Sequence, residues 1–182
     1  MNFSAVILAG GKSPRLGRDK TWLEVDGQPL LARQIELARG LGAAEVFISG
    51  RADTDYAAFG CHVLRDKFAG AGPLAGIERA LDAATSPLLL VLAVDLPEMN
   101  VEFLRRLGAI PLVDGNVGPL AAFYPTTAHS PAEAVLHNNR NAVAAFAENC
   151  VQSGLARFVE LAAAEIRRFA NWNSPADLPC LT

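Results

Sequence analysis

The stretch Leu88-Leu89-Leu90-Val91-Leu92-Ala93-Val94-Asp95 decides the fold of this chain. Its seven consecutive apolar residues are too few to span a membrane and are typical of a strand that is covered on both faces. A second run of this kind, from Ala5 to Ala9, stands near the N-terminus. Strands that are buried on both faces need helices around them, so the two runs predict an α/β protein.

Segments typical of strands and of helices alternate along the rest of the chain. Further strands are expected over residues 45–49, 62–65, 118–124 and 165–169. Helices are expected over residues 29–41, 73–84, 100–107, 130–138 and 140–151, with another after Gly154 and a short closing one from Ala176. Residues 12–27 are expected to be mostly loop. This alternation indicates βαβ units and therefore a mainly parallel sheet.

The overall composition excludes several classes of protein. The 182 residues predict one compact domain, and 51 % apolar residues are enough for a real core. The net charge of −3 argues against a general nucleic-acid binder, which needs a surplus of cations. No apolar run is long enough for a membrane span, and the N-terminus lacks the basic start of a signal peptide. A cytoplasmic protein is therefore expected.

The mild average charge hides a local cationic segment. Four basic side chains and a single acidic one give residues 1–20 a net charge of +3, which leaves −6 on the remainder. The charged residues are Lys12, Arg15, Arg18, Asp19 and Lys20. Such a segment on an acidic protein suggests a small anionic ligand, although a solvated basic turn is the more ordinary explanation of the charge by itself.

Three loops are expected to meet at one edge of the predicted sheet. Ligands of parallel sheets bind beyond the carboxyl ends of the strands, which selects the loops after Ala9 and Arg65 and the side chain of Asp95. The adjacent Gly10 and Gly11 let backbone N–H groups approach an anion closely. Asp95 is suited to Mg²⁺, although a lone aspartate can equally cap the next turn. Together the three elements suit nucleoside triphosphate chemistry.

Two well-known phosphate-binding motifs do not fit these loops. Gly11-Lys12-Ser13 lacks the earlier glycine of a P-loop, because position 6 is Val. Gly70-Ala71-Gly72-Pro73-Leu74-Ala75 matches a dinucleotide fingerprint by letter. It does not follow its strand directly, however, and Pro73 removes one N–H from the phosphate cradle.

Four motifs between residues 8 and 178 resemble, in order, those of the MobA-like nucleotidyltransferases, and most closely those of the molybdenum cofactor guanylyltransferases. They read Leu8-Ala9-Gly10-Gly11 with Arg15, Gly17, Asp19 and Lys20; Gly72-Pro73-Leu74-Ala75-Gly76 preceded by Asp66; Val94-Asp95-Leu96-Pro97; and Asn171-Trp172-Asn173-Ser174-Pro175-Ala176-Asp177-Leu178. Four motifs in one order are far more specific than any of them alone.

The resemblance implies a three-layer Rossmann-like fold whose mainly parallel sheet is flanked by helices. It also implies one nucleotidyltransferase domain over residues 1–182, with a nucleotide-binding part over about 1–95 and an acceptor-side part over about 96–182. The implied reaction is transfer of GMP from GTP to the terminal phosphate of molybdenum-bearing molybdopterin, with release of pyrophosphate. Mg²⁺ is the implied cofactor, and the implied partners are GTP, a molybdopterin-type acceptor, and apoproteins or chaperones of molybdoenzymes.

The resemblance also assigns roles to single residues. Lys20, Arg15 and Asp95 are the expected catalytic residues, with Asp95 as the metal ligand. The expected nucleotide contacts are Leu8, Ala9, Gly10, Gly11, Lys20, Ser49, Asp66, Gly72, Pro73 and Asp95. Asn171 and Asn173 are expected on the acceptor side. The chain departs from the family pattern in a short stretch over residues 105–114 and in Gly118, both near the acceptor side.

Two alternative functions stay open at this point. One is a cytidylyl- or other nucleotidyltransferase of the same fold with a different acceptor. The other is a non-catalytic nucleotide-binding module that delivers a cofactor, against which Lys20 and Asp95 argue, because a mere binder needs neither at the scissile phosphate. The three cysteines and three histidines show no metal-ligand spacing, and Trp22 is expected to fill the core.

Overall fold

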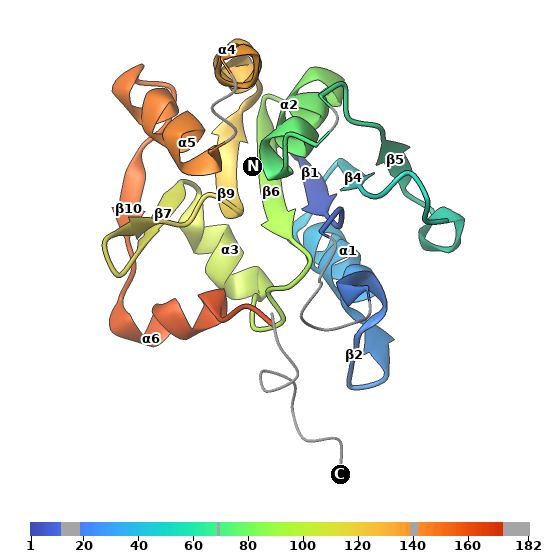
Figure 1. Cartoon of the computed structure of the whole chain (residues 1–182). Coiled ribbons are helices and arrows are strands. Elements are labelled where there is room, and N and C mark those ends of the chain that lie inside the picture. The colour runs from blue at the N-terminus through green and yellow to red at the C-terminus, as the bar shows by residue number, and fades with distance from the viewer. Residues whose placement is uncertain (12–18, 69, 139–141, 173–182) are drawn as a thin grey trace.

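The computed structural model describes residues 1–11, 19–68, 70–138 and 142–172 (Figure 1). The strands are β1 (Phe3–Leu8), β2 (Glu24–Val25), β3 (Gln28–Pro29), β4 (Glu45–Ser49), β5 (His62–Leu64), β6 (Leu88–Ala93), β7 (Ile110–Val113), β8 (Asn116–Val117), β9 (Ala121–Pro125) and β10 (Phe158–Glu160). The α-helices are α1 (Leu30–Leu41), α2 (Pro73–Ala83), α3 (Val101–Leu107), α4 (His129–His137), α5 (Val143–Gln152) and α6 (Ala163–Ile166). Short 3₁₀-helices are η1 (Lys20–Trp22), η2 (Ala57–Phe59), η3 (Thr126–Ala128) and η4 (Arg167–Phe169).

The central sheet has the strand order β5-β4-β1-β6-β9. The first four strands run parallel, and β9 pairs antiparallel with β6 at one edge. Because the two apolar runs form β1 and β6 side by side in the middle, the prediction of a mainly parallel sheet is confirmed. The parallel direction brings the carboxyl ends of β5, β4, β1 and β6 to one edge of the sheet.

Helices cover both faces of this sheet, which confirms the three-layer α/β prediction. Successive residues of β1 alternate between two hydrophobic clusters, with Ala5 and Ile7 in one and Val6 in the other. The first cluster contains buried side chains of α1 and α3, and the second contains those of α2, α4 and α5. Each fully buried aliphatic side chain contributes about 1.5–3 kcal/mol, so the strand residues anchor both outer layers.

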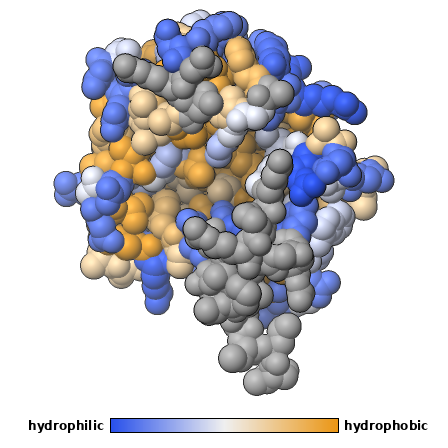
Figure 2. All heavy atoms as spheres, viewed as in Figure 1, coloured by the Kyte–Doolittle hydropathy of each residue, from blue (hydrophilic) through white to orange (hydrophobic). Residues whose placement is uncertain are grey.

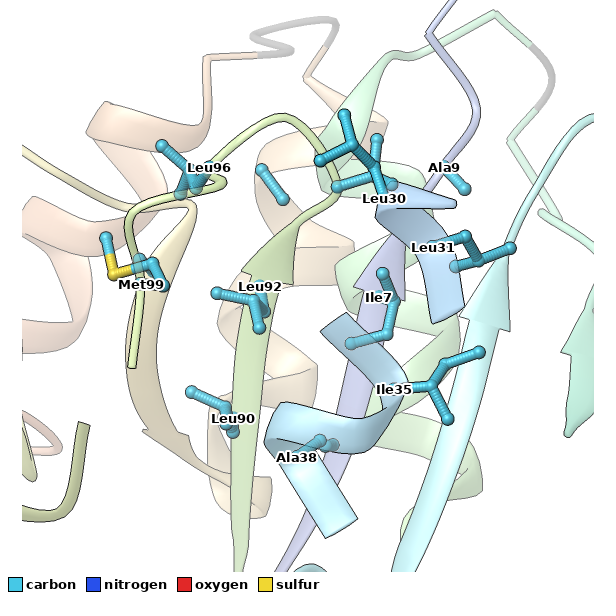
Figure 3. Close-up of a cluster of buried hydrophobic side chains, with 14 of the residues drawn as sticks. Ile7, Ala9, Leu30, Leu31, Ile35, Ala38, Leu90, Leu92, Leu96 and Met99 are labelled. Atoms are coloured by element: carbon cyan, nitrogen blue, oxygen red, sulfur yellow. The ribbon is translucent and has the colours of Figure 1, made fainter. Parts of the chain in front are cut away.

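The first cluster places α1 directly over the two central strands (Figure 3). Ile7 of β1 and Leu90 and Leu92 of β6 lie beneath Leu31 and Ile35 of the helix in this cluster. The helix ends at Gly42, which adopts a left-handed conformation with φ of 97° and donates its N–H to the last carbonyl groups. The predicted stop is therefore confirmed, as is the start of α3, where the Asn100 side chain accepts a hydrogen bond from the N–H of Phe103.

A second, three-stranded sheet with the order β10-β7-β8 was not predicted from the sequence. The expected helix after Gly154 is wrong, because Phe158–Glu160 forms a strand parallel to β7. Pro111 within β7 has no N–H to donate, but its carbonyl group accepts a hydrogen bond from the N–H of Gly118. Apolar residues gather over this part of the molecule, on the left of the face shown in Figure 2.

Two other local expectations need correction. The strand expected over residues 165–169 is wrong: α6 and η4 occupy this segment, and Glu165 caps the helix by accepting a hydrogen bond from the N–H of Ala162. The expected loop over residues 12–27 contains η1 and the start of a small hairpin made by β2 and β3. Asp26 and Gly27, both with positive φ, form its tight turn.

The closing helix expected from Ala176 lies outside the described residues. None of the helices in the described part of the chain combines the length and the hydrophobicity that crossing a membrane requires.

Candidate active site

A cleft of about 1210 Å³ opens at the carboxyl ends of β5, β4, β1 and β6. Every residue predicted as a nucleotide contact lines this cleft: Leu8, Ala9, Gly10, Gly11, Lys20, Ser49, Asp66, Gly72, Pro73 and Asp95. Two other predicted site residues, Arg15 and Asn173, lie outside the described residues. Asn171 is exposed and does not line the cleft. The structure therefore brings together loops that are up to 87 residues apart in the sequence, from Leu8 to Asp95.

The glycines after β1 leave room for a ligand. The strand is still held at its end, where the N–H of Ala9 donates to the carbonyl group of Ser49 on β4 at 2.7 Å. Beyond it, a Cβ added at Gly10 or Gly11 would meet no atom of the described residues within 4 Å. Packing within the described part of the chain therefore does not require glycine at either position. Glycine at these positions leaves the backbone open to the close approach of a ligand.

Lys20 and Asp95 form an ion pair at the β6 side of the cleft. The Nζ atom of Lys20 lies 2.7 Å from Oδ2 of Asp95, and their side chains are only 12 % and 20 % exposed. Asp19 starts η1 by accepting a hydrogen bond from the N–H of Thr21, and the buried Thr21 anchors this short helix. The pair thus joins the segment after β1 to the end of β6 and holds both charged groups at the cleft.

Asp95 fits a metal ion that is bound jointly with a substrate. The described residues contain no cluster of three or more acidic, histidine or cysteine side chains that could hold a metal by themselves. Mg²⁺ in nucleotide sites is typically held by one or two carboxylates together with substrate phosphates and water. A single partly exposed carboxylate at the end of β6 satisfies the protein's share of such a site.

Asp66 lies at the opposite, β5 side of the cleft. Partial burial and the nearby negative charge of Glu78 raise the pKa of its carboxyl group, whereas a hydrogen bond from the Ser49 hydroxyl opposes this shift. A carboxylate with reduced hydration is a good acceptor for hydroxyl groups of a ligand. Two acidic residues thus stand on opposite sides of the cleft, Asp95 beside a lysine and Asp66 beside a hydroxyl group.

Glu78 is the fully buried acid of α2, and a neighbouring histidine explains its burial. Its Oε1 atom lies 2.8 Å from Nε2 of His129 and 3.5 Å from Nζ of Lys67. His129 is thus a structural residue, consistent with the absence of metal-ligand spacing in the sequence. Burial raises the pKa of the Cys150 thiol to about 12, so this thiol is not a nucleophile.

One wall of the cleft was missed in the sequence. The segment between β4 and η2 lines the cleft with Arg51, Ala52, Thr54, Asp55 and Tyr56. It follows the carboxyl end of β4, so the rule that selected the loops after β1, β5 and β6 would have selected it as well. Behind it, Phe59 of η2 packs against Trp22 of η1 with ring centroids 5.2 Å apart. Trp22 is 46 % exposed, so its expected role as a core residue is wrong.

We expect Gly76→Ala to lower the free energy of unfolding by about 1–3 kcal/mol, because it overpacks the contact between α2 and β4. An added Cβ would collide with the Oγ atom of Ser49 and lie 2.9 Å from its Cβ. Chemical denaturation measures the effect. In Gly40→Ala the new Cβ would have its nearest neighbour at 3.6 Å, so this control should be neutral or slightly stabilising. An equal loss of stability in both variants would contradict the packing argument. Adding Ser49→Gly to Gly76→Ala should restore stability, because it removes the Ser49 atoms with which the new Cβ collides.

Comparison with known proteins places these features in a wider group. Residues 5–168 match the family model described as the MobA-like NTP transferase domain. The chain is 37 % identical over 185 aligned residues to a probable molybdenum cofactor guanylyltransferase of Opitutus terrae, covering 96 % of this chain and 92 % of the relative. The molybdopterin-guanine dinucleotide biosynthesis protein A of Archaeoglobus fulgidus is structurally similar, with a TM-score of 0.72 at 22 % identity over 96 % of this chain and 94 % of that one.

The same fold also carries other nucleotide chemistry. The 2-C-methyl-D-erythritol 4-phosphate cytidylyltransferase of Thermus thermophilus superposes with a TM-score of 0.68 at 19 % identity, over 94 % of this chain and 93 % of that one. At such identities the likeness shows the fold alone. The fold by itself therefore does not identify the nucleotide that a protein of this kind uses.

Proposed function

The chain belongs to the family of MobA-like NTP transferases, and from this premise we propose that it transfers GMP from GTP to the terminal phosphate of a molybdopterin-type acceptor. The relatives named as guanylyltransferases support this choice of substrates. The observation that carries the proposal is the convergence of the predicted nucleotide contacts in one cleft, with an acid and a lysine at its β6 end. The resulting cofactor carries a guanine nucleotide joined through a pyrophosphate bond.

The chemistry requires little of a general base. A terminal phosphate oxygen of the acceptor attacks the α-phosphorus of GTP and forms the new P–O bond, while the bond between the α-phosphorus and the bridging oxygen breaks. Pyrophosphate leaves with the electron pair of that bond. Because the attacking oxygen is already anionic, the protein needs chiefly to reduce charge repulsion and to stabilise the leaving group.

Lys20, Arg15 and Asp95 are proposed to do this work. Nucleotidyltransferases of this kind generally use a divalent metal, and we assign Mg²⁺, which supplies positive charge between the phosphates when bound. Asp95 would hold it together with the nucleotide. Lys20 pairs with this carboxylate at 2.7 Å, and its ammonium group would lie beside the phosphates of a nucleotide in the cleft. Arg15 would supply a further cation to the phosphates.

The remaining nucleotide contacts are proposed to divide along the cleft. Leu8, Ala9, Gly10 and Gly11 would hold the nucleotide through backbone groups, and Ser49 and Asp66 would contact its nucleoside end. Gly72 and Pro73, at the start of α2, would complete the wall. Residues 1–95 form the nucleotide-binding part in this proposal, and residues 96–182 form the acceptor-side part with Asn171 and Asn173.

The product has to reach other proteins. We propose that apoproteins of molybdoenzymes, or chaperones that serve them, receive the nucleotide-bearing cofactor from this enzyme in the cytoplasm. These assignments follow from the guanylyltransferase reaction, because its product is a cofactor.

The direct test is transfer of radiolabelled GMP from GTP to molybdopterin by the full-length protein with Mg²⁺. We expect label in the dinucleotide product, release of pyrophosphate, and loss of both with EDTA. Thermal stability should rise with GTP and Mg²⁺ more than with CTP and Mg²⁺, because binding to the native state stabilises it. Transfer from CTP in place of GTP would identify a cytidylyltransferase. Nucleotide binding without transfer would favour a non-catalytic delivery module.

A further inference from the structure

Arg51 occupies the wall of the cleft that no motif had indicated. It lies two residues beyond the end of β4, next to Gly50, and both residues line the cleft. In the strand order, β4 is separated from β6 by β1. With neighbouring strands about 4.8 Å apart, Arg51 stands roughly 10 Å along the cleft from the strand that carries Asp95. The base and sugar of a nucleotide whose phosphates lie at Lys20 and Asp95 would extend over this distance.

The backbone beneath Arg51 is held by Tyr56. The phenolic oxygen of Tyr56 accepts a hydrogen bond from the N–H of Arg51 at 3.0 Å. The Tyr56 ring is 2 % exposed and packs so closely on Gly50 that an added Cβ there would lie 2.6 Å from Cζ. A flexible surface loop lacks such anchors. The start of this wall is therefore a fixed platform for the arginine side chain.

The guanidinium group itself is oriented by Asp53. Its Nε atom donates to Oδ1 of Asp53 at 2.8 Å, and its Nη2 atom donates to Oδ2 at 2.6 Å. The hydrogen bonds from Arg51 lower the pKa of Asp53 to about 2, so the carboxylate stays charged at neutral pH. A bidentate pair of this kind fixes the plane of the guanidinium, while its side chain remains 31 % exposed.

One donor edge of the guanidinium remains available to a ligand. Arginine has five N–H donors, and the pair with Asp53 uses one on Nε and one on Nη2. The opposite edge presents one N–H from Nη1 and one from Nη2, and among the described residues no acceptor is hydrogen-bonded to Nη1. Two parallel donors match two adjacent acceptors. Guanine presents such a pair in O6 and N7, whereas adenine and cytosine present an amino donor at the equivalent edge.

A phosphate is the less suitable ligand for this edge. The positive charge of Arg51 is already balanced by Asp53, whose side chain is 66 % exposed and would repel a nearby phosphate. The pKa of Arg51 is raised chiefly by Asp53 and also by Asp19, which adds a second negative charge in the surroundings of the guanidinium. These acids do not disfavour a neutral base.

We propose that Arg51, held by Asp53, donates two hydrogen bonds to O6 and N7 of guanine and thereby selects GTP among nucleoside triphosphates. This inference rests on the proposed function, because it assumes that a guanine nucleotide fills the cleft. Such a contact would distinguish GTP from CTP. The fold cannot do this, because a cytidylyltransferase shares it. Lysine cannot replace arginine in this role, because an ammonium group does not offer two parallel donors in one plane.

The test compares the binding of GTP, 7-deaza-GTP and GMP, with Mg²⁺, to full-length protein by calorimetry. The 7-deaza analogue lacks N7 and therefore loses one of the two acceptors. Wild-type protein should bind it about tenfold more weakly than GTP. Arg51→Ala should weaken GTP binding by about tenfold or more and bind GTP and 7-deaza-GTP equally. Arg51→Lys should behave like Arg51→Ala. The control Arg39→Ala removes an exposed, hydrogen-bonded arginine of α1 and should keep the wild-type preference.

The same measurements can overturn the proposal. Arg51→Ala should lose the same factor for GMP as for GTP, since both carry the base, and a loss confined to GTP would identify a phosphate contact instead. The proposal would also be contradicted if Arg51→Ala still bound GTP more tightly than 7-deaza-GTP, as the wild type is expected to do. If either contradicting result is found and wild-type protein still transfers GMP, this inference fails and the proposed function stands. If wild-type protein binds no guanine nucleotide, the proposed function fails with it.

Discussion

Lys20→Ala is expected to lower the kcat of GMP transfer by about 100- to 1000-fold, the effect of removing one preorganised donor that stabilises developing charge. The Nζ atom of Lys20 already lies at the cleft, 2.7 Å from Asp95. In this position it would contribute positive charge beside the phosphates of a bound nucleotide. Because Lys20 is assigned to charge that develops during the reaction, kcat should fall more than the affinity for GTP. Steady-state kinetics with labelled GTP separates the two quantities.

The stability of the Lys20→Ala variant should change little by comparison. Loss of a partly exposed ion pair costs about 1 kcal/mol, which lowers the Tm of a chain of this size by about 2–4 °C. The matched control is Lys67→Ala, which also removes a lysine paired with a carboxylate, here Asp82 at 2.9 Å, and does not line the cleft. It should retain nearly full activity. Near-complete GMP transfer by Lys20→Ala would show that this lysine is not the catalytic cation.

Asp95→Asn is expected to abolish the Mg²⁺-dependent activity, with a fall in kcat of at least about 100-fold even at saturating Mg²⁺. The amide keeps the shape of the side chain and can still accept a hydrogen bond from Lys20, but it lacks the negative charge by which a carboxylate attracts Mg²⁺. A titration of activity against Mg²⁺ concentration measures the effect. Thermal denaturation without metal should remain close to that of the wild type.

A suitable control for this variant is Asp114→Asn, at the exposed turn between β7 and β8. Asp114 has a φ of 50°, a conformation that asparagine also tolerates, so the fold is preserved. Its Mg²⁺ dependence should equal that of the wild type. A wild-type rate for Asp95→Asn at saturating Mg²⁺ would refute the assignment of Asp95 as the metal ligand.

Local signals were sufficient for the elements that form the centre of the fold. The apolar runs at β1 and β6 are buried whatever their neighbours are, and Gly42, Pro73 and Asn100 mark helix ends through their own backbone chemistry. The short strands β7 and β10 could not be predicted in this way. Each has three or four residues, and each exists because it pairs with a segment that is distant in the sequence.

The chain's own order of residues determined the chemistry of the candidate site: glycines after one strand, a lysine shortly beyond them, and an aspartate at the end of another. The tertiary structure alone decided which groups meet. It paired Lys20 with Asp95 across 75 residues and placed Arg51, whose guanidinium group is paired with Asp53, in the lining of the same cleft. The physical reason is that residue types and backbone propensities are local properties of the sequence. Which residues become neighbours at the sheet edge depends on the strand order, and long-range packing sets that order.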